Sequence, residues 1–475
     1  MKVLFVTSEA QPFAASGGLA DVAGSLPQAL RQRLIGCRIV MPLYGEISQE
    51  MRDQMRFLTS FSVPVSWRHQ YCGVFEARWG GVVYYFLDNE YYFKRKGIYG
   101  HYDDAERFAF FSRAVLEMLP FIDFKPNIIH CNDWQTALVP TYYNVFYKQN
   151  GWYSGIKTIF TIHNIQYQGK YGSELYQDVI GVPSHARSIL DYDGCINYMK
   201  GAIESANRVT TVSPSYAWEI RDPWFSYGLD PILNARAWKI RGILNGIDTD
   251  RYNPETDPDI YANYNVNDLS GKAVCKQKLQ ERLGLEQNAE VPIIAMVTRL
   301  VAPKGLDLVK AAIDQIMREE YVQFVILGSG DWEYESFFRS MQDRYPGRFS
   351  ACHGFVPELS RKIYAGADLF LMPSKSEPCG LSQMIALRYG TIPIVREVGG
   401  LRDSIQDSGA GDGNGFTFKT YDAMDMLGCI RRALAGYWQR DGWNVLIRRA
   451  MSCDNSWNRS ANDYINLYKE VINEG

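Results

Sequence analysis

The 475-residue chain lacks the features that mark several common classes of protein. Its nine cysteines, spread from Cys37 to Cys453, form no CxxC motif and no tight cluster, which argues against a disulfide framework and a structural zinc site. The net charge is only −3, so no basic excess predicts a nucleic-acid partner. The first apolar run is too short for a signal peptide, and no run reaches the length of a membrane span. These absences predict a cytoplasmic protein that binds neither nucleic acid nor a membrane.

Several catalytic motifs are also missing. The chain has no P-loop and no GxSxG nucleophile motif. The segment GSGD at 328–331 begins like a dinucleotide-binding fingerprint, but Glu333 stands where its third glycine belongs, which argues against a dehydrogenase. Because aspartates favour turns, three DxD triplets in polar loops predict turn chemistry and no metal site. The triplets are Asp191/Asp193, Asp248/Asp250 and Asp257/Asp259.

The chain does contain strand-like runs that alternate with helix-like segments along its whole length. Examples of the runs are NIIHCND, KTIFTIHN, PIIAMVTRL and ADLFLMPS. Such alternation predicts parallel sheets covered by helices, the doubly wound α/β class. A polar, turn-rich stretch at 242–272 precedes a fresh apolar strand at 291–297, so we expect a domain boundary near residue 243. Two Rossmann-like domains would then face each other across a cleft.

Ligands of open α/β sheets bind outside the carboxyl ends of the strands, and the conspicuous motifs of this chain follow strand-like runs. SGGLAD follows the first run and precedes apolar residues at helical spacing, so Gly17 and Gly18 stand at an expected helix start. Glycine permits a positive φ and a close approach of backbone amides to a ligand, and a helix start favours an anion. A tight turn is the simpler interpretation of two glycines alone. The GGLxD pattern recurs at 399–403.

Charged residues follow the first strand-like run of the second domain. Arg299 and Lys304 would each be ordinary surface charges in isolation, but five residues apart in one loop they predict a clamp for a diphosphate. His163 ends another strand-like run, where a structural histidine is the default interpretation.

Taken in their order along the chain, these segments resemble the bacterial glycogen synthases and plant starch synthases of glycosyltransferase family 5. The resemblance covers nearly the whole sequence, and its last block is the most specific. The similar segments are SGGLADVAGSLP (16–27), HCNDWQTALVP (130–140), FTIHNIQYQG (160–169), MKGAIESANRVTTVSPSYAWEI (199–220), ILNGID (243–248), VTRLVAPKGLDL (297–308) and PSKSEPCGLSQMIALRYGTIPIVREVGGL (373–401).

The resemblance implies a GT-B fold of two Rossmann-like domains. Residues 1–242 would form the acceptor-side domain with the Gly-Gly turn, residues 243–455 the domain that binds the nucleotide sugar, and residues 456–475 a terminal helix that packs back on the first domain. The implied reaction transfers glucose from ADP-glucose to the non-reducing end of an α-1,4-glucan such as glycogen. It retains the anomeric configuration and uses no metal or other cofactor.

The resemblance also implies roles for individual residues. Glu377 and His163 match the catalytic pocket, and Phe355 matches a position that stacks on adenine. The remaining donor-site candidates are Gly17, Gly18, Arg299, Lys304, Asp133, Asn245, Cys379, Gly380, Leu381 and Ser382, with Ala15 and Asp21 as further possible members. Breaking the anomeric bond releases a nucleoside diphosphate, so catalysis needs positive charge and amide donors at the departing phosphates.

Two departures from the family pattern leave alternatives open. Ala15 stands where the family motif usually has a lysine beside the donor site, and Ile385 stands where many retaining GT-B enzymes carry a second glutamate. The alternatives are a GT-B glucosyltransferase that uses UDP-glucose or another acceptor, and a non-catalytic glucan-binding paralogue.

Overall fold

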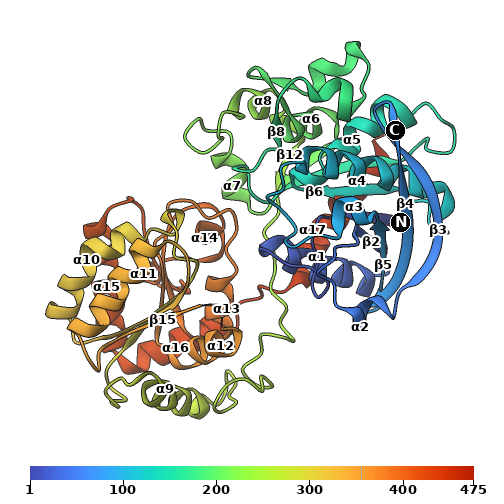
Figure 1. The fold of residues 1–475 in the computed structure, drawn as a ribbon. Helices are drawn as coiled ribbons and strands as arrows, with labels where there is room; N and C mark the ends of the chain where they lie inside the picture. Colours follow the sequence, from blue (N-terminus) through green and yellow to red (C-terminus); the bar gives the residue numbers. More distant parts are fainter. Residues whose placement is uncertain (355, 475) are drawn as a thin grey trace. The chain divides into compact units, whose positions relative to one another are not determined.

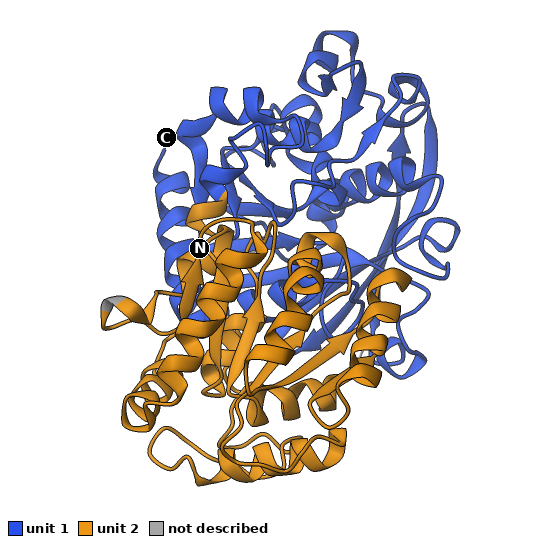
Figure 2. Cartoon of the chain, turned by 90° about the vertical axis from the view of Figure 1, so that its left-hand side faces the viewer, with its two compact units in different colours: residues 1–212, 217–243, 457–475 blue, residues 213–216, 244–456 orange. Residues whose placement is uncertain are grey.

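A computed structural model describes residues 1–354 and 356–474 and divides the chain into two compact units (Figure 2). Unit 1 comprises residues 1–212, 217–243 and the chain from 457 onward, and unit 2 comprises residues 213–216 and 244–456. The four-residue segment 213–216 was not anticipated from the sequence. It belongs to unit 2, although the chain on both sides of it belongs to unit 1.

Unit 1 is built on a nine-stranded sheet (Figure 1). Its strands are β1 (Lys2–Val6), β2 (Gly36–Pro42), β3 (Arg56–Val65), β4 (Arg68–Trp79), β5 (Val82–Asp88), β6 (Ile128–Asn132), β7 (Lys157–Ile162), β11 (Arg208–Thr211) and β12 (Ile240–Gly242). Their order across the sheet is β12-β11-β7-β6-β1-β2-β5-β4-β3. All neighbours pair in parallel except β4, which is antiparallel to both β3 and β5. The parallel part agrees with the predicted α/β class, and the antiparallel edge is an addition to it.

The other elements of unit 1 are helices and one small sheet. The small sheet is antiparallel, in the order β8-β10-β9, with β8 (Lys170–Tyr171), β9 (Asp191–Tyr192) and β10 (Cys195–Asn197). The helices are α1 (Gly18–Gln32), α2 (Gln49–Arg52), α3 (Glu90–Phe93), α4 (Asp104–Met118), α5 (Leu138–Tyr142), α6 (Tyr198–Ser205), α8 (Asp230–Ala235) and α17 (Trp457–Asn473), while α7 (Pro214–Glu219) begins in unit 2 and ends in unit 1.

Unit 2 is built on a six-stranded sheet that is parallel throughout. Its order is β15-β14-β13-β16-β17-β18, with β13 (Ile293–Val297), β14 (Gln323–Gly328), β15 (Phe349–His353), β16 (Leu369–Met372), β17 (Ile392–Arg396) and β18 (Phe416–Phe418). Its helices are α9 (Ser270–Leu283), α10 (Leu306–Glu319), α11 (Trp332–Arg344), α12 (Pro357–Gly366), α13 (Ser382–Arg388), α14 (Gly399–Ser404), α15 (Ala423–Tyr437) and α16 (Arg440–Met451).

The apolar patterns of the sequence account for the core of unit 1. Val3 to Val6 of β1 are fully buried, as expected for a central strand of a parallel sheet. The helical spacing after the Gly-Gly pair is confirmed, because α1 begins at Gly18 and buries Leu19, Val22, Leu26 and Leu30.

The terminal helix α17 packs against α1 within unit 1 (Figure 1). Its Tyr468 hydroxyl lies 2.7 Å from Nδ1 of His130 on β6, and both side chains are fully buried. The end of the chain therefore contributes to the core of the unit that contains its beginning.

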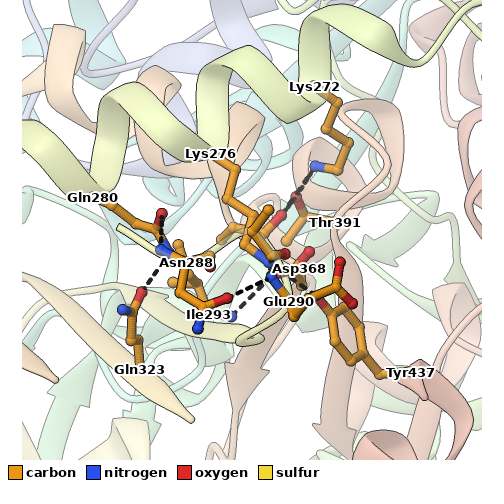
Figure 3. A network of polar contacts seen from close by, with 12 residues as sticks. Lys272, Lys276, Gln280, Asn288, Glu290, Ile293, Gln323, Asp368, Thr391 and Tyr437 are labelled. Carbon is orange, nitrogen blue, oxygen red and sulfur yellow. Dashed lines mark hydrogen bonds and ion pairs between the residues drawn. The ribbon is translucent and has the colours of Figure 1, made fainter. Parts of the chain in front are cut away.

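In unit 2, two lysines of α9 enter the interior (Figure 3). The Lys272 ammonium donates to the carbonyl oxygens of Ala365, Ala367 and Tyr389 and to the Thr391 hydroxyl, over 2.9–3.1 Å. Lys276 forms an ion pair with Asp368 at 2.9 Å. These bonds tie α9 to the segments that precede β16 and β17, so a helix that follows the long polar stretch is held in place by buried polar contacts.

Candidate functional site

The segments singled out in the sequence follow the carboxyl ends of neighbouring parallel strands. In unit 1, the Gly-Gly turn follows β1, Asp133 follows β6 and His163 follows β7, and these strands are adjacent in the order β7-β6-β1. In unit 2, Arg299 and Lys304 follow β13 and Glu377 follows β16, which are also adjacent. Each unit thus carries one group of candidate residues at the edge where α/β sheets bind ligands.

The Gly-Gly turn leaves open space at the start of α1. Gly17 has an extended φ of −161°, so its conformation is accessible to any residue and does not use the positive φ that glycine permits. A methyl group at Gly17 would come no closer than 3.9 Å to Glu9, and one at Gly18 would meet nothing within 4 Å. The glycines therefore keep the space around the first amides of the helix free of side chains.

A buried carboxylate, Glu9, supports this turn. It is only 4% exposed, and it accepts hydrogen bonds from the backbone amide of Ser16 and, at 2.9 Å, from the Ser16 hydroxyl. Burial raises the pKa of Glu9, and the hydrogen bonds from Ser16 and Gly17 offset part of this effect. Glu9 was not among the residues predicted from the sequence. The sequence feature that could have identified it is an acidic residue between the apolar run of β1 and the two glycines.

The two further candidates of this region, Ala15 and Asp21, lie beside the turn. Ala15 is exposed, so the position has room for a longer side chain. Asp21 lies in the first turn of α1, and its charge acts on Glu9.

Asp133 and His163 lie in direct contact. The Asp133 carboxylate accepts a hydrogen bond of 2.7 Å from the backbone amide of His163, and Asp133 itself adopts a positive φ of 57°. A non-glycine residue in this conformation is uncommon and points to a functional constraint. Burial, with a smaller contribution from the nearby charge of Glu9, raises the pKa of Asp133 to about 7, although hydrogen bonds from the amides of His163 and Asn164 oppose this shift.

The His163 imidazole is held neutral and in one tautomer. Its Nε2 lies 2.9 Å from Oδ1 of Asn132, whose amide nitrogen is already committed to the carbonyl oxygens of Val6 and His130. Because Oδ1 can only accept, Nε2 of His163 donates and Nδ1 carries the free electron pair. Burial lowers the pKa of His163 to about 3. Nε2 thus has the structural role that the sequence predicts for His163, while Nδ1 can accept a hydrogen bond from a ligand.

In unit 2, Lys304 and Glu377 form an ion pair. The lysine ammonium lies 2.6 Å from Oε2 of Glu377, which also accepts a hydrogen bond of 3.1 Å from the Ser374 hydroxyl. Glu377 is 6% exposed, whereas Arg299 is exposed. The predicted pairing of Arg299 with Lys304 as a clamp therefore needs a refinement, since without a ligand the lysine contacts the carboxylate.

The loop after Glu377 is shaped by its backbone. Gly380 has a φ of 72°, and a methyl group there would come within 2.5 Å of the Gln383 side chain. The Gln383 amide in turn donates to the carbonyl oxygens of Cys379 and Gly380 at 3.1 and 2.9 Å. Leu381 caps α13, which begins at Ser382, so the amides of this predicted donor segment do lie at a helix start.

Cys379 and Asn245 meet beside this loop. Burial raises the pKa of the Cys379 thiol to about 12, and a hydrogen bond from the Asn245 backbone offsets part of the effect. The Oδ1 atom of Asn245 is buried and has no hydrogen-bond partner among the described residues. A buried acceptor of this kind is consistent with a ligand hydroxyl as its partner. The remaining donor candidate, Phe355, lies outside the described residues.

The second GGLxD copy differs in role from the first. Gly399 has a φ of 46°, and a methyl group there would lie 2.0 Å from the carbonyl oxygen of Glu377. A methyl group at Gly400 would lie 2.1 Å from the carbonyl oxygen of Cys379. These glycines are thus packed against the Glu377 loop and do not line open space.

The glycines of GSGD also have a packing role. A methyl group at Gly328 would meet the Thr298 carbonyl at 1.9 Å, and one at Gly330 would meet the Leu300 carbonyl at 2.4 Å. The glycines of this motif therefore allow the chain at the end of β14 to lie close to the loop that carries Arg299.

Two of the DxD triplets act in turns, as predicted. Asp248 accepts from the amides of Asp250 and Arg251, and Asp257 accepts from the amide of Asp259. Within residues 1–354 and 356–474, no three His, Cys, Asp or Glu side chains gather closely enough to hold a metal ion.

Known proteins are similar to this chain in sequence and in fold. A family model described as the starch synthase catalytic domain matches residues 2–235, and a model described as glycosyl transferases group 1 matches residues 278–444. The glycogen synthase of Geobacillus thermodenitrificans is 51% identical over 99% of this chain and 98% of its own length. The glycogen synthase of Clostridium botulinum strain Alaska E43 is 48% identical over 99% of each chain.

Two solved structures resemble the whole chain. The catalytic domain of starch synthase IV from Arabidopsis thaliana, bound to ADP and acarbose, matches with a TM-score of 0.90 and 36% identity over 99% of each chain. Sucrose-phosphate synthase from Thermosynechococcus elongatus matches with a TM-score of 0.63 and 17% identity over 100% of each chain, which is a likeness of fold alone.

Proposed function

Because the chain belongs to the glycogen synthase family of glycosyltransferases and has the GT-B fold, we propose that it transfers glucose from ADP-glucose to the non-reducing end of an α-1,4-glucan. ADP and acarbose in the Arabidopsis structure support an adenosine diphosphate sugar as the donor and an α-glucan as the acceptor. In this assignment unit 2 binds the donor and unit 1 contributes the acceptor side.

The observation that carries the proposal is the partly buried Lys304–Glu377 pair at the carboxyl edge of the unit 2 sheet. A nucleotide sugar needs a cation at its departing diphosphate and a fixed carboxylate at its sugar. Lys304 supplies the cation, with Arg299 as the second, and Glu377 supplies the carboxylate. A 2.6 Å contact keeps both groups in place before the substrate arrives, which lowers the reorganisation needed in the transition state.

The proposed reaction retains the anomeric configuration. A double displacement would need a carboxylate nucleophile beneath the anomeric carbon. Glu377 is engaged by Lys304 and Ser374, so we assign it to stabilising positive charge on the sugar, with front-face attack by the acceptor hydroxyl within an ion-pair-like state. We assign the neutral His163 and the Asp133 carboxyl of unit 1 to hydrogen bonds with sugar hydroxyls.

We further propose that the reaction takes place in the cytoplasm. All nine cysteines are free, which fits a reducing compartment. No helix in the described part of the chain is both long enough and apolar enough to cross a membrane.

A transfer assay tests the proposed function. The purified protein is incubated with glycogen and radiolabelled ADP-glucose or UDP-glucose, and label is measured in the polymer. We expect transfer from ADP-glucose with retention of the α-configuration. Transfer from UDP-glucose alone would replace the donor assignment, and transfer from neither would contradict the proposal.

A further inference from the structure

The backbone of the loop that carries Glu377 makes contacts that substrate binding does not explain. The segment 213–216 reaches this loop through Ser213, which is fully buried and donates a hydrogen bond of 2.7 Å to the carbonyl oxygen of Pro378. The same carbonyl accepts from the amide of Gly400 at 3.2 Å. The peptide next to Glu377 is therefore held from two sides.

The aspartate of the second GGLxD copy fixes the same segment. Asp403 accepts one hydrogen bond of 2.7 Å from the backbone amide of Ser215 and another of 2.6 Å from its hydroxyl. Both carboxylate oxygens are used, and bonds to a charged acceptor are stronger than neutral ones. Gly399 and Gly400 bring this helix onto the backbone of residues 377–379. The recurring motif thus has two parts: its glycines contact the loop, and its aspartate holds the segment that supports the loop.

We propose that Ser213 and Asp403 are positioning residues for Glu377. They clamp segment 213–216 onto the loop that carries the carboxylate, and neither touches substrate. The clamp lies within unit 2, to which segment 213–216 and the Glu377 loop both belong. This inference rests on the proposed function, in which Glu377 acts on the sugar.

The expected effect follows from where the carboxylate acts. A small displacement of Glu377 weakens an interaction made mainly in the transition state, so kcat should fall while the KM for glycogen changes little. Ser213→Ala removes the hydrogen bond to Pro378 and also the one of 3.1 Å that the hydroxyl accepts from the Tyr216 amide, and it should lower kcat about 2- to 10-fold. Asp403→Asn removes a charged acceptor and should lower kcat about 10- to 100-fold. Ser213→Thr keeps the hydroxyl and should restore most of the rate.

The experiment compares these variants with the wild type under ADP-glucose and glycogen, and adds thermal melting and ADP affinity by calorimetry. Thr141→Val is the matched control, because Thr141 is also fully buried and its hydroxyl is bonded to Ser205 within unit 1. Lower kcat with ADP affinity and melting temperature near those of the wild type, and rescue by Ser213→Thr, would support the clamp.

Other results would overturn it. Wild-type kcat in folded Ser213→Ala and Asp403→Asn would show that the loop needs no clamp. Loss of rate that follows loss of melting temperature, in these variants and in Thr141→Val alike, would reduce the contacts to a structural role. An inactive wild type would instead contradict the proposed function, so the two failures are distinguishable.

Discussion

The ammonium of Lys304 lies 2.6 Å from the carboxylate of Glu377. The ion pair brings together two residues for which the sequence predicts separate roles. The lysine was assigned to the diphosphate and the glutamate to the sugar. Since each neutralises the other in a partly buried site, removing one leaves an unpaired charge beside the substrate. The two residues should therefore behave as one unit in mutagenesis.

Glu377→Gln and Lys304→Met should each lower kcat/KM for ADP-glucose, the first by about 10²- to 10³-fold and the second by about 10- to 100-fold. The double variant should lose less than the product of the two, because each single change already breaks the pair. Steady-state kinetics of all four proteins measure this coupling. A double variant whose loss equals the product would show that the residues act independently.

Arg299→Ala should weaken donor use without disturbing the fold, since the side chain is exposed. Loss of a hydrogen bond to a charged phosphate predicts about a 10- to 100-fold lower kcat/KM for ADP-glucose. Glycogen binding without donor, measured by cosedimentation, should stay at the wild-type level. Poor glycogen binding with normal donor kinetics would move Arg299 to the acceptor.

The pH dependence of stability should carry opposite contributions from Asp133 and His163. The pKa of Asp133 is raised from 3.8 to about 7. Between these two pH values the folded protein therefore keeps a proton that the unfolded chain has lost. The contribution of Asp133 to the free energy of unfolding is therefore fully present below about pH 4 and is lost as the pH rises through 7. The pKa of His163 is lowered from 6.5 to about 3, so its contribution is present above pH 6.5 and is lost as the pH falls.

Urea unfolding from pH 5 to pH 8 separates these two effects. The stability advantage of the wild type over Asp133→Asn should shrink as the pH rises, and its advantage over His163→Gln should shrink as the pH falls below 6.5. Each slope is at most about 1.4 kcal/mol per pH unit. Stability curves that run parallel for all three proteins would contradict both assignments.

Ala15→Lys should raise kcat/KM for ADP-glucose by a few-fold up to about 100-fold, the range of one charge-assisted contact. The position is exposed and lies beside a turn whose nearby charged residues, Glu9 and Asp21, are acidic. A lysine there would add positive charge for the departing diphosphate. Kinetics with ADP-glucose and UDP-glucose test this, and no gain with either donor would refute a charge deficit in the wild type.

Lys272→Met should lower the free energy of unfolding of unit 2 by about 2–4 kcal/mol, because three buried carbonyl oxygens lose their shared donor. Lys278→Met is the matched control on the same helix, since Lys278 is half exposed and pairs with Glu281 at the surface. Denaturant unfolding of both variants gives the comparison. Equal stability of the two would mean that the Lys272 contacts contribute nothing net.

The sequence by itself determined the fold class and the location of the candidate residues. Alternating strand-like and helix-like segments specify parallel sheets, and motifs that follow strands must lie at the carboxyl edge, because neighbouring parallel strands end on the same side. The helix after Gly17 could also be predicted, since its apolar residues recur with the period of a helix. These features are local, so a single stretch of sequence contains the information.

Only the tertiary structure decided which of these residues meet. Asp403 and Ser215 lie 188 positions apart, Lys304 and Glu377 lie 73 apart, and no local pattern encodes such pairings. The two GGLxD copies make the same point. The two copies have the same sequence pattern, yet Gly18 lies beside open space while Gly400 packs closely against the Cys379 carbonyl. What a glycine does depends on what packs against it, and packing is a property of the folded chain.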